Sequence, residues 1–362
     1  MAGRIILTAV TAALFVAAGV MSCNGSGGKD IQTDKTEQTE QTQQAVQTPV
    51  PDRTLTITAV GDCTLATDIN ASKDAGFVGY AEKNGTEYFL SEVKDVFAED
   101  DLTIVNFEGT LSDRGERENK QFAFRGKPEY VETLTSASVE AANLANNHSS
   151  DYGKVSLEDT KEILDEAGIL NCRGVENVSV SEINGIQVGL VGINYLNDQM
   201  KTELEDAIEK AKDMGAEIVI LSIHWGAEKA TKPSDEQTEA AYRAIDCGAD
   251  LVIGTHPHVL QGIEKYKGRY ICYSLGNFCF GGNSNPSDKD SAMFRQTFTL
   301  TADGLKDDDS YEIIPCRISG ADGYNDYRPV IATGEKRANI ESKLSAYSKD
   351  LGMTGLKFRE VE

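Results

Sequence analysis

Histidine is scarce in this chain of 362 residues, where it occurs only at His148, His224, His256 and His258. Each of the four follows a short apolar run that is typical of a buried β-strand. Ligand sites in α/β sheets lie at the carboxyl ends of strands, so histidines confined to such positions indicate a single site. Imidazole is a common metal ligand, and the pattern therefore predicts a metal centre.

The chain also lacks an excess of positive charge. It has 35 Lys and Arg against 58 Asp and Glu, which gives a formal net charge of −23. General nucleic-acid binding requires a basic surface, so the composition excludes that class of function.

Closely spaced cysteine pairs are absent as well. None of the seven cysteines forms the CxxC spacing of a zinc knot. An exported chain would be able to pair the six that follow Cys23. Several of them lie within apolar runs, however, where a reduced buried cysteine is expected. We therefore predict no disulfide.

The N-terminus indicates export. Residues 1–22 combine Arg4 with an apolar run that is short for a membrane span, which predicts a signal peptide. The end of this run resembles a bacterial lipobox and predicts lipidation at Cys23. Simple secretion and an uncleaved anchor are the alternatives. Residues 23–53 have almost nothing to bury and predict a disordered linker. The expected location is outside the cytoplasm, anchored to the bacterial cell membrane as a lipoprotein.

Strand-like and helix-like patterns alternate between residues 54 and 335, which predicts one α/β domain. Asn184-Gly185 and Lys267-Gly268 separate pairs of β-like runs and predict hairpins, so the sheets are expected to be mixed. The remaining residues, 336–362, are expected to form a C-terminal helix and tail.

Three local features are also predicted. Gln121–Phe124 has the pattern of an edge strand. Ser156 is expected to cap a helix that ends at Gly168. Lys201–Met214 is expected to form one helix.

Polar residues follow five of the predicted strands: Asp62, Glu108, Asn147 with His148, His224, and His256 with His258. Taken singly, each has a structural alternative as a turn residue or a packed histidine. Jointly, they form a ligand set that suits Mn, Zn or Fe better than Ca. A carboxylate shared by two ions about 3.5–4 Å apart is the usual basis of a two-metal hydrolytic site. The sequence therefore predicts one or two divalent transition-metal ions.

Six sequence blocks together resemble the CapA/PgsA-type poly-γ-glutamate capsule-synthesis family, whose domain is similar to calcineurin-like metallophosphoesterases. The blocks are AVGDCTL (59–65), NFEGTLSD (106–113), LANNHSSDYG (144–153), SIHWGAE (222–228), IGTHPHVLQG (253–262) and YSLGNF (273–278). The resemblance covers residues 54–320 in order. It implies two mixed β-sheets sandwiched by helices in a four-layer fold.

The resemblance also implies roles for individual residues. One ion would be held by Glu108, Asn147, His224 and His256. The other would be held by Asp62, Glu108 and His258. His148 and Asp62 are the implied catalytic residues, with His148 as the proton donor to the leaving group. Thr64 stands where the metallophosphoesterase pattern has a histidine, so the second ion has fewer ligands. Cys63 does not replace that histidine, because it points to the opposite side of an extended strand.

Four further residues are expected around this centre. Arg125 (or its neighbour Lys127) would hold an anion, with a plain surface charge as the alternative. Asn277 would line the pocket. Asp151 would brace His148 from behind, and Glu228 would do the same for His224.

These observations predict a metal-dependent, phosphoesterase-like hydrolase that acts in capsule or poly-γ-glutamate surface-polymer synthesis. Its expected partners are the anionic polymer or its precursor and the membrane proteins of capsule synthesis. The alternative is a non-catalytic, membrane-tethered accessory subunit of a polymer synthesis or export machine, which Thr64 and Glu108 favour as departures from the pattern. A third possibility is a hydrolase or transferase that acts on the amide bonds of the polymer.

Overall fold

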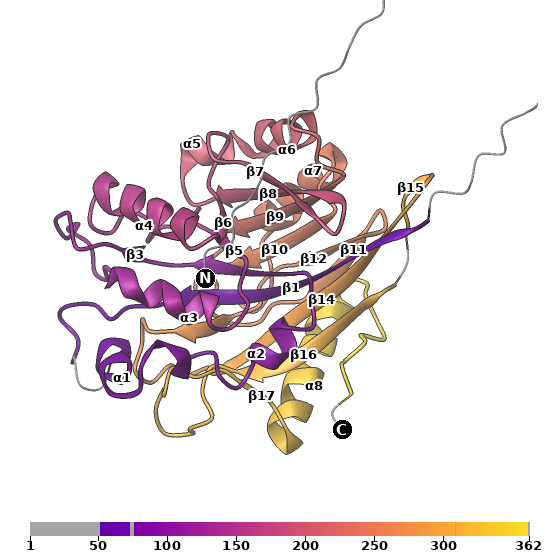
Figure 1. Ribbon diagram of the computed structural model, residues 1–362. Helices are drawn as coiled ribbons and strands as arrows, with labels where there is room; N and C mark the ends of the chain where they lie inside the picture. Colours follow the sequence, from indigo (N-terminus) through magenta and orange to yellow (C-terminus); the bar gives the residue numbers. More distant parts are fainter. Residues whose placement is uncertain (1–50, 73–75, 308, 361–362) are drawn as a thin grey trace, which may run out of the picture. The chain divides into compact units, whose positions relative to one another are not determined.

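Two mixed β-sheets packed face to face form the centre of the protein (Figure 1). The computed structural model describes residues 51–72, 76–307 and 309–360. The larger sheet runs in the order β17-β16-β14-β1-β2-β5-β6, with β13 beside β1 and β15 beside β14. Its strands are β1 (Arg53–Thr64), β2 (Leu102–Phe107), β5 (Ala141–Asn143), β6 (Leu170–Cys172), β13 (Asn277–Phe280), β14 (Asp290–Thr301), β15 (Gly304–Leu305), β16 (Tyr311–Arg317) and β17 (Val330–Ile331).

The second sheet has six strands in the order β11-β12-β10-β9-β8-β7. They are β7 (Ser179–Ile183), β8 (Ile186–Asn194), β9 (Ile218–His224), β10 (Leu251–Thr255), β11 (Ile263–Tyr266) and β12 (Arg269–Cys272). A small separate pair consists of β3 (Thr110–Leu111) and β4 (Arg125–Gly126). Both large sheets contain parallel and antiparallel pairs, which confirms the prediction of mixed sheets.

Side-chain alternation along the strands creates the layers. In β9, Ile218 and Ile220 join the core between the sheets, whereas Val219, Leu221 and Ile223 face the helices outside. This is the period of two that places successive side chains on opposite faces of a sheet. The α/β sandwich expected from the sequence is therefore present.

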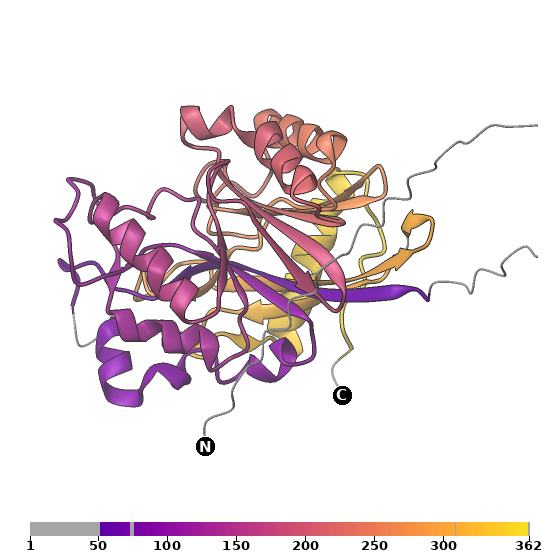
Figure 2. The same cartoon turned by 45° about the horizontal axis from the view of Figure 1, so that its top comes forward.

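Helices cover the outer face of each sheet (Figures 1 and 2). Four pack on the larger sheet: α1 (Phe77–Asn84), α2 (Lys94–Phe97), α3 (Glu132–Thr135) and α4 (Lys154–Glu166). The six-stranded sheet is covered by α5 (Asp198–Lys201), α6 (Leu204–Asp213) and α7 (Asp235–Cys247). The last helix, α8 (Gly334–Asp350), contributes Ile340 and Leu344 to the core between the sheets.

Both predicted hairpins are confirmed. β7 and β8 are joined at Asn184 and Gly185, which have φ values of 51° and 75°. β11 and β12 are joined at Lys267 and Gly268, with φ values of 47° and 80°. Two consecutive residues with positive φ are the requirement of a type I′ turn, which matches the twist of the strands it connects.

Three local predictions are wrong. Residues 121–124 form no strand, because the backbone N–H groups of Ala123 and Phe124 donate to the carboxylates of Asp68 and Asp151. Ser156 does not cap α4; it lies inside the helix, and its hydroxyl donates to the carbonyl of Gly153.

The third wrong prediction is the single helix over residues 201–214. It is two helices, α5 and α6, separated at Thr202 and Glu203. The Glu203 carboxylate accepts a hydrogen bond from the backbone N–H of Val175, which ties the break to a neighbouring loop.

The predicted signal peptide, Cys23 and almost all of the predicted linker lie outside the described residues. Within the described part of the chain, none of the helices combines the length and apolarity needed to span a membrane. The linker was expected to extend to residue 53, but Arg53 is already the first residue of β1.

Glu140, which precedes β5, predicts a pH-dependent stability. Burial raises the pKa of Glu140 to about 7, from an ordinary value of 4.5, although Thr103 N–H donates to its carboxylate. The folded state therefore binds this proton more tightly than the unfolded state does. The contribution of Glu140 to the free energy of unfolding falls as pH rises from about 4.5 to 7. We expect Glu140→Gln to be more stable than the wild type at pH 8 by on the order of 1–2 kcal/mol, which is less than the full pKa shift would give because solvent screens the partly exposed carboxylate.

The difference between Glu140→Gln and the wild type should vanish at pH 4, because both side chains are then neutral. Urea unfolding at the two pH values measures it. Glu239→Gln, on the exposed face of α7, is the matched control and should change neither value. Equal stabilities of Glu140→Gln and wild type at pH 8 would contradict the prediction.

Candidate metal centre

The polar residues that follow the parallel strands meet at one edge of the two sheets. In the larger sheet, Asp62 pairs in register with Asn106 of β2, and Asn106 pairs with Asn143 of β5. In the six-stranded sheet, His224 of β9 pairs with Thr255 of β10. Because parallel strands end at a common edge, residues far apart in sequence become neighbours there.

Asp62, Glu108 and His258 form one half of the cluster. Each offers a ligand atom within 4.8 Å of the others. His258 Nδ1 lies 3.0 Å from Asp62 Oδ2 and 2.9 Å from the amide oxygen of Asn277 on β13. These three residues are the set expected for the second ion, and Asn277 contacts one of them, His258, directly.

His224, Asn147 and His256 form the other half. His224 Nε2 lies 2.9 Å from the amide oxygen of Asn147 and 3.9 Å from Glu108 Oε1. The rings of His224 and His256 are 4.7 Å apart. Together with Glu108, these are the residues expected for the first ion, and the structure brings all four into one place.

Glu108 lies between the two halves with an unusual environment. Its side chain is fully buried, and within the described part of the chain neither carboxylate oxygen has a hydrogen-bond partner. The nearest imidazole nitrogens are the Nε2 atoms of His148 and His224, at 3.7 and 3.9 Å from Oε1. A buried carboxylate without partners is costly, and a divalent cation is the group that would satisfy it. His256 Nδ1 is likewise buried and unpartnered among the described residues. The residues present therefore fit a metal.

Burial and neighbouring charges shift the pKa values of four groups in this cluster, Glu108, His224, His256 and His258. Burial raises the pKa of Glu108 to about 7. Burial would lower the pKa of His258, but the Glu108 and Asp62 carboxylates outweigh it and raise that pKa to about 10. Burial, followed by the charge of His258, lowers the pKa of His256 to about 4, and burial holds the pKa of His224 well below its ordinary value. His224 and His256 are thus neutral imidazoles, the form that binds metals.

The loop that carries the last two histidines is strained. His256 and His258 have φ values of 94° and 58°, in the region that side chains other than glycine rarely adopt. The neighbouring backbone fixes this conformation, because His256 N–H donates to Asp62 Oδ2 and Lys229 N–H donates to the carbonyl of Pro257. Strain of this kind is concentrated at functional sites.

His148 has a supporting network behind it. Its Nδ1 lies 2.7 Å from Asp151 Oδ2, in the position expected for a brace. Lys120 Nζ lies 2.6 Å from the other oxygen of Asp151 and 2.7 Å from the carbonyl of Asn147. Lys120 was not among the expected residues, since nothing in its loop signals a contact 31 positions further along the chain.

Two expected neighbours lie elsewhere. Glu228 is exposed and has no described contact with His224; its charge acts instead on His256 and His258, where it is a minor influence that favours the protonated imidazole. His224 Nδ1 is held by Thr255 Oγ1, at 3.0 Å, and approached by the Asn106 amide, at 3.3 Å. The prediction of Glu228 as a brace for His224 is therefore wrong.

Arg125 also lies apart from the ligand atoms. Its guanidinium stacks on the Tyr152 ring at 4.0 Å and donates to the carbonyls of Arg114 and Gly115. Lys127 is exposed and lies 3.6 Å from Glu129. Neither cation has a described contact with the residues of the centre, so the anion-holding role expected of them stays a prediction.

Thr64 and Cys63 occupy the positions expected from the sequence. The Thr64 hydroxyl is buried without a partner in the described structure, and Thr64 has no described contact with the ligand atoms. Cys63 packs in the core beneath the helices, on the side away from the centre. Burial raises the pKa of Cys63 to about 12, so the thiol stays protonated and is no substitute ligand. All six cysteines in the described residues are free.

Asn106 connects three other polar side chains of the cluster by hydrogen bonds, a role that the sequence did not indicate. Its amide donates to Asp62 Oδ1 at 2.7 Å, and its carbonyl oxygen accepts from the amides of Asn143 and Asn146 at 3.1 and 3.2 Å. Asn106→Ala would leave these buried groups unsatisfied. We expect it to lower the free energy of unfolding of the metal-free protein by about 2–4 kcal/mol.

Urea unfolding in the presence of a chelator measures the effect of Asn106→Ala. Asn70→Ala is the control, because its exposed side chain makes no described hydrogen bond; it should change the stability by less than about 0.5 kcal/mol. A loss no larger than that of the control would show that the network contributes little.

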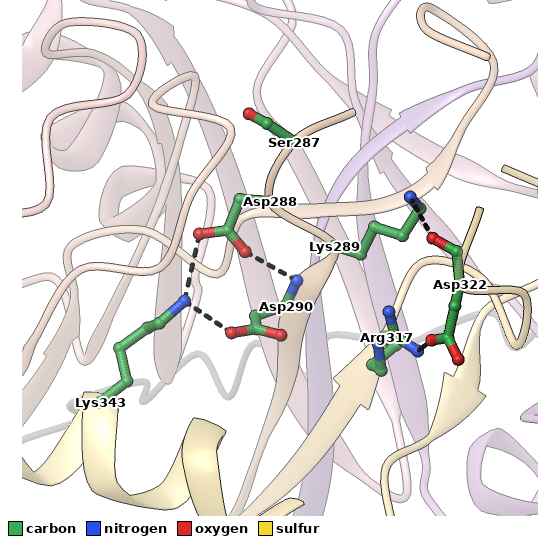
Figure 3. A pocket seen from close by; sticks show the side chains of 7 residues that line it. All are labelled: Ser287, Asp288, Lys289, Asp290, Arg317, Asp322 and Lys343. Carbon is green, nitrogen blue, oxygen red and sulfur yellow. Dashed lines mark hydrogen bonds and ion pairs between the residues drawn. The ribbon is translucent and has the colours of Figure 1, made fainter. Parts of the chain in front are cut away.

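A separate charged pocket, with a volume of about 530 Å³, lies between the start of β14 and α8 (Figure 3). It is lined by Ser287, Asp288, Lys289, Asp290, Arg317, Asp322 and Lys343. Its charges neutralise one another, since Lys343 pairs with Asp288 and Asp290 and Arg317 pairs with Asp322. We assign it no ligand.

The fold and the cluster define the class: a two-sheet α/β sandwich with a candidate metal centre at the carboxyl ends of its parallel strands. Within that class, the chain belongs to the family described as bacterial capsule synthesis protein PGA_cap, whose model matches residues 56–282. The resemblance recognised in the sequence is thereby confirmed.

Named relatives agree with this family. The chain is 32% identical over 266 residues to the capsule biosynthesis protein CapA of Bacillus anthracis, covering 66% of this chain and 62% of CapA. It is 31% identical over 222 residues to the PGA biosynthesis protein CapA of Bacillus subtilis, covering 55% and 58% of the two chains. A probable polyglutamine synthesis accessory protein of Mycobacterium tuberculosis is 30% identical over 210 residues, covering 49% and 55%. The chain thus spans only about three fifths of the two CapA proteins.

Among solved structures, a hypothetical protein from Thermus thermophilus matches 72% of this chain and 99% of its own, with a TM-score of 0.45 and 14% sequence identity.

Proposed function

We propose that this chain acts in the synthesis of a capsule or poly-γ-glutamate surface polymer as an exported, lipid-anchored, metal-dependent phosphoesterase-like hydrolase. Membership of the capsule synthesis family and the names of the CapA relatives support the polymer context. The single observation that carries the hydrolase is Glu108, a buried carboxylate without hydrogen-bond partners among the described residues, between two groups of potential ligands.

Two ligand groups would share Glu108. Asp62 and His258 would hold one ion, and Asn147, His224 and His256 would hold the other. Once bound, divalent metals of this kind supply Lewis-acid stabilisation of phosphoryl oxygens and lower the pKa of a coordinated water. Mn, Zn and Fe all suit this mixture of carboxylate, amide and imidazole ligands.

His148 would donate a proton to the leaving oxygen of the ester. Its Nε2 faces Glu108, and its Nδ1 faces Asp151, so the ring is held at the edge of the centre from behind. Lys120 fixes Asp151 and the backbone that carries Asn147 in one geometry. A general acid positioned in this way contributes about 10²–10⁴-fold to a hydrolytic rate.

The direct test combines metal content with turnover. The purified protein is dialysed against Mn²⁺ or Zn²⁺, measured by elemental analysis, and assayed on phosphomonoesters and phosphodiesters. We expect one or two ions per chain and metal-dependent release of phosphate or alcohol. Absence of both metal and turnover would refute the hydrolase. Partition of the cell-derived protein into a detergent phase tests the proposed lipid anchor.

The second candidate function is that of an accessory subunit without catalysis in a polymer synthesis or export machine. Thr64 favours this function, because it has no described contact with the centre and stands where the metallophosphoesterase pattern has a histidine. The mycobacterial relative, whose name describes it as an accessory protein, favours it as well. His256→Ala separates the two functions. If this substitution removes the metal and leaves polymer production intact, polymer synthesis does not require the metal chemistry.

A further inference from the structure

Three phenylalanine rings border the metal centre and form what we call the aromatic strip: Phe280, Phe124 and Phe122. The Phe280 ring lies 5.2 Å from the His258 ring. The Phe124 ring lies 4.6 Å from the His148 ring, and Phe122 stacks on Phe124 at 6.4 Å with an interplanar angle of 5°. Ring contacts therefore run outward from His258 and from the proposed proton donor His148.

Gly282 lies between the Phe280 and Phe124 rings of the strip. A Cβ atom at this position would lie 2.7 Å from Phe280 Cζ and 3.0 Å from Phe124 Cζ. The two rings thus approach each other across the backbone of Gly282, which only a residue without a side chain permits. The aromatic strip thus consists of two buried rings, Phe280 beside His258 and Phe124 beside His148, and the exposed ring of Phe122 stacked on Phe124.

The outer end of the strip is exposed and held in place. Phe280 and Phe124 are 8% and 4% exposed, whereas Phe122 is 49% exposed. The backbone on both sides of Phe122 is held by hydrogen bonds, because Arg117 donates to the carbonyl of Gln121 and the N–H of Ala123 donates to Asp68. A single exposed phenylalanine is ordinary on a protein surface. Its stacking in line with the proposed proton donor is what distinguishes Phe122.

We propose that the aromatic strip binds the leaving group of the substrate, and that the substrate is a phosphate ester of an apolar alcohol such as a lipid alcohol. The inference rests on the phosphoesterase function proposed above. His148 can protonate only an oxygen next to its ring. Phe124 packs against that ring and Phe122 stacks on Phe124, so a carbon chain attached to that oxygen would reach the exposed ring of Phe122. An apolar chain would bury surface there at about 25 cal/mol per Å². A polyol or an ionic chain would lose hydrogen bonds to water without replacement.

The reaction balances with water as the second substrate. The oxygen of water forms a new bond to phosphorus, and the bond between phosphorus and the alcohol oxygen breaks. The electron pair of the broken bond stays on the alcohol oxygen, which takes a proton from His148. The attacking water keeps one hydrogen as the new phosphate hydroxyl and releases the other to the solvent, which reprotonates His148. The products are the phosphate and the free apolar alcohol, whose chain leaves along the aromatic strip.

The experiment compares two esters of primary alcohols, decyl phosphate below its micelle-forming concentration and glycerol 1-phosphate. Phosphate release by the full-length protein loaded with Mn²⁺ gives kcat/KM for each. We expect the wild type to prefer decyl phosphate at least tenfold. Phe122→Ala should reduce that preference about tenfold, Phe122→Leu should retain most of it, and Phe122→Gln should behave like alanine.

Met214→Ala is the matched control, since Met214 is also 49% exposed and lies at the end of α6; it should leave the preference unchanged. Turnover of both esters with no preference, or a preference insensitive to Phe122→Ala, would overturn the inference while leaving the phosphoesterase intact.

Failure to hydrolyse either ester would count against the phosphoesterase itself. Calorimetric titration of the metal-loaded protein with decyl phosphate then tests whether the aromatic strip binds apolar phosphates, independently of hydrolysis. Binding that Phe122→Ala weakens about tenfold supports the strip as a site for apolar phosphates. Absent binding, or binding that is equal in the two proteins, overturns it.

Discussion

Glu108→Gln is expected to lower the affinity of the protein for Mn²⁺ or Zn²⁺ by about 100-fold or more, with loss of metal-dependent turnover. In the proposed centre, Glu108 is the residue that both ligand groups would share, and the change replaces its buried carboxyl by a neutral amide of the same shape. Removing even an outer partner of a metal ligand costs about 10–100-fold in affinity, and a shared ligand should cost at least as much.

Isothermal titration and the metal-induced rise in Tm measure the effect of Glu108→Gln. Glu140→Gln is the matched control, because it makes the same chemical change at a half-buried site at the amino-terminal end of β5. The control should bind metal as the wild type does. An unaltered affinity in Glu108→Gln would remove the central argument for the metal centre.

His148→Gln should lower kcat by about 10²–10⁴-fold while the metal content stays that of the wild type. The structure separates His148 from the other histidines, since its Nδ1 faces Asp151 and its ring packs on Phe124 rather than on another imidazole. All four histidines of the chain lie in this site, so the informative comparison is His256→Gln, which should lose metal and turnover together.

Measuring kcat for His148→Gln on esters with activated leaving groups sharpens this test. A p-nitrophenolate needs no proton on departure, so the defect should shrink on p-nitrophenyl phosphate relative to an alkyl phosphate. An equal loss on both esters would indicate that His148 holds the centre together rather than supplying a proton.

Those parts of the fold and site that depend on local periodicity could be predicted from the sequence. The strand ending at His224 and the two glycine hairpins are examples, because their pattern is set by neighbours along the chain. The convergence of the polar strand ends followed from the geometry of parallel sheets. The match to the capsule synthesis family confirmed the resemblance, whereas the metal-binding and catalytic roles of the individual residues remain predictions.

What the sequence could not supply were contacts made across the fold. Asn106 looked like an ordinary strand end, and its role as a hub depends on the register of three strands. Residues 121–124 have a β-like pattern, but carboxylates of Asp68 and Asp151 take the hydrogen bonds that a strand would need. Two further cases depend on contacts between distant loops. Lys120 contacts Asp151, and Glu228 does not make the contact with His224 that was expected.

The division of the candidate ligands between the two sheets has a mechanical consequence. Asp62, Glu108 and Asn147 come from the larger sheet, and His224, His256 and His258 come from the six-stranded sheet. An ion shared by both sets would add a link between two layers that are held by apolar packing, which has no preferred direction, and by a few polar contacts such as that of His224 with Asn147. Metal would then resist shear between the sheets, and the force needed to slide one over the other would depend on metal concentration.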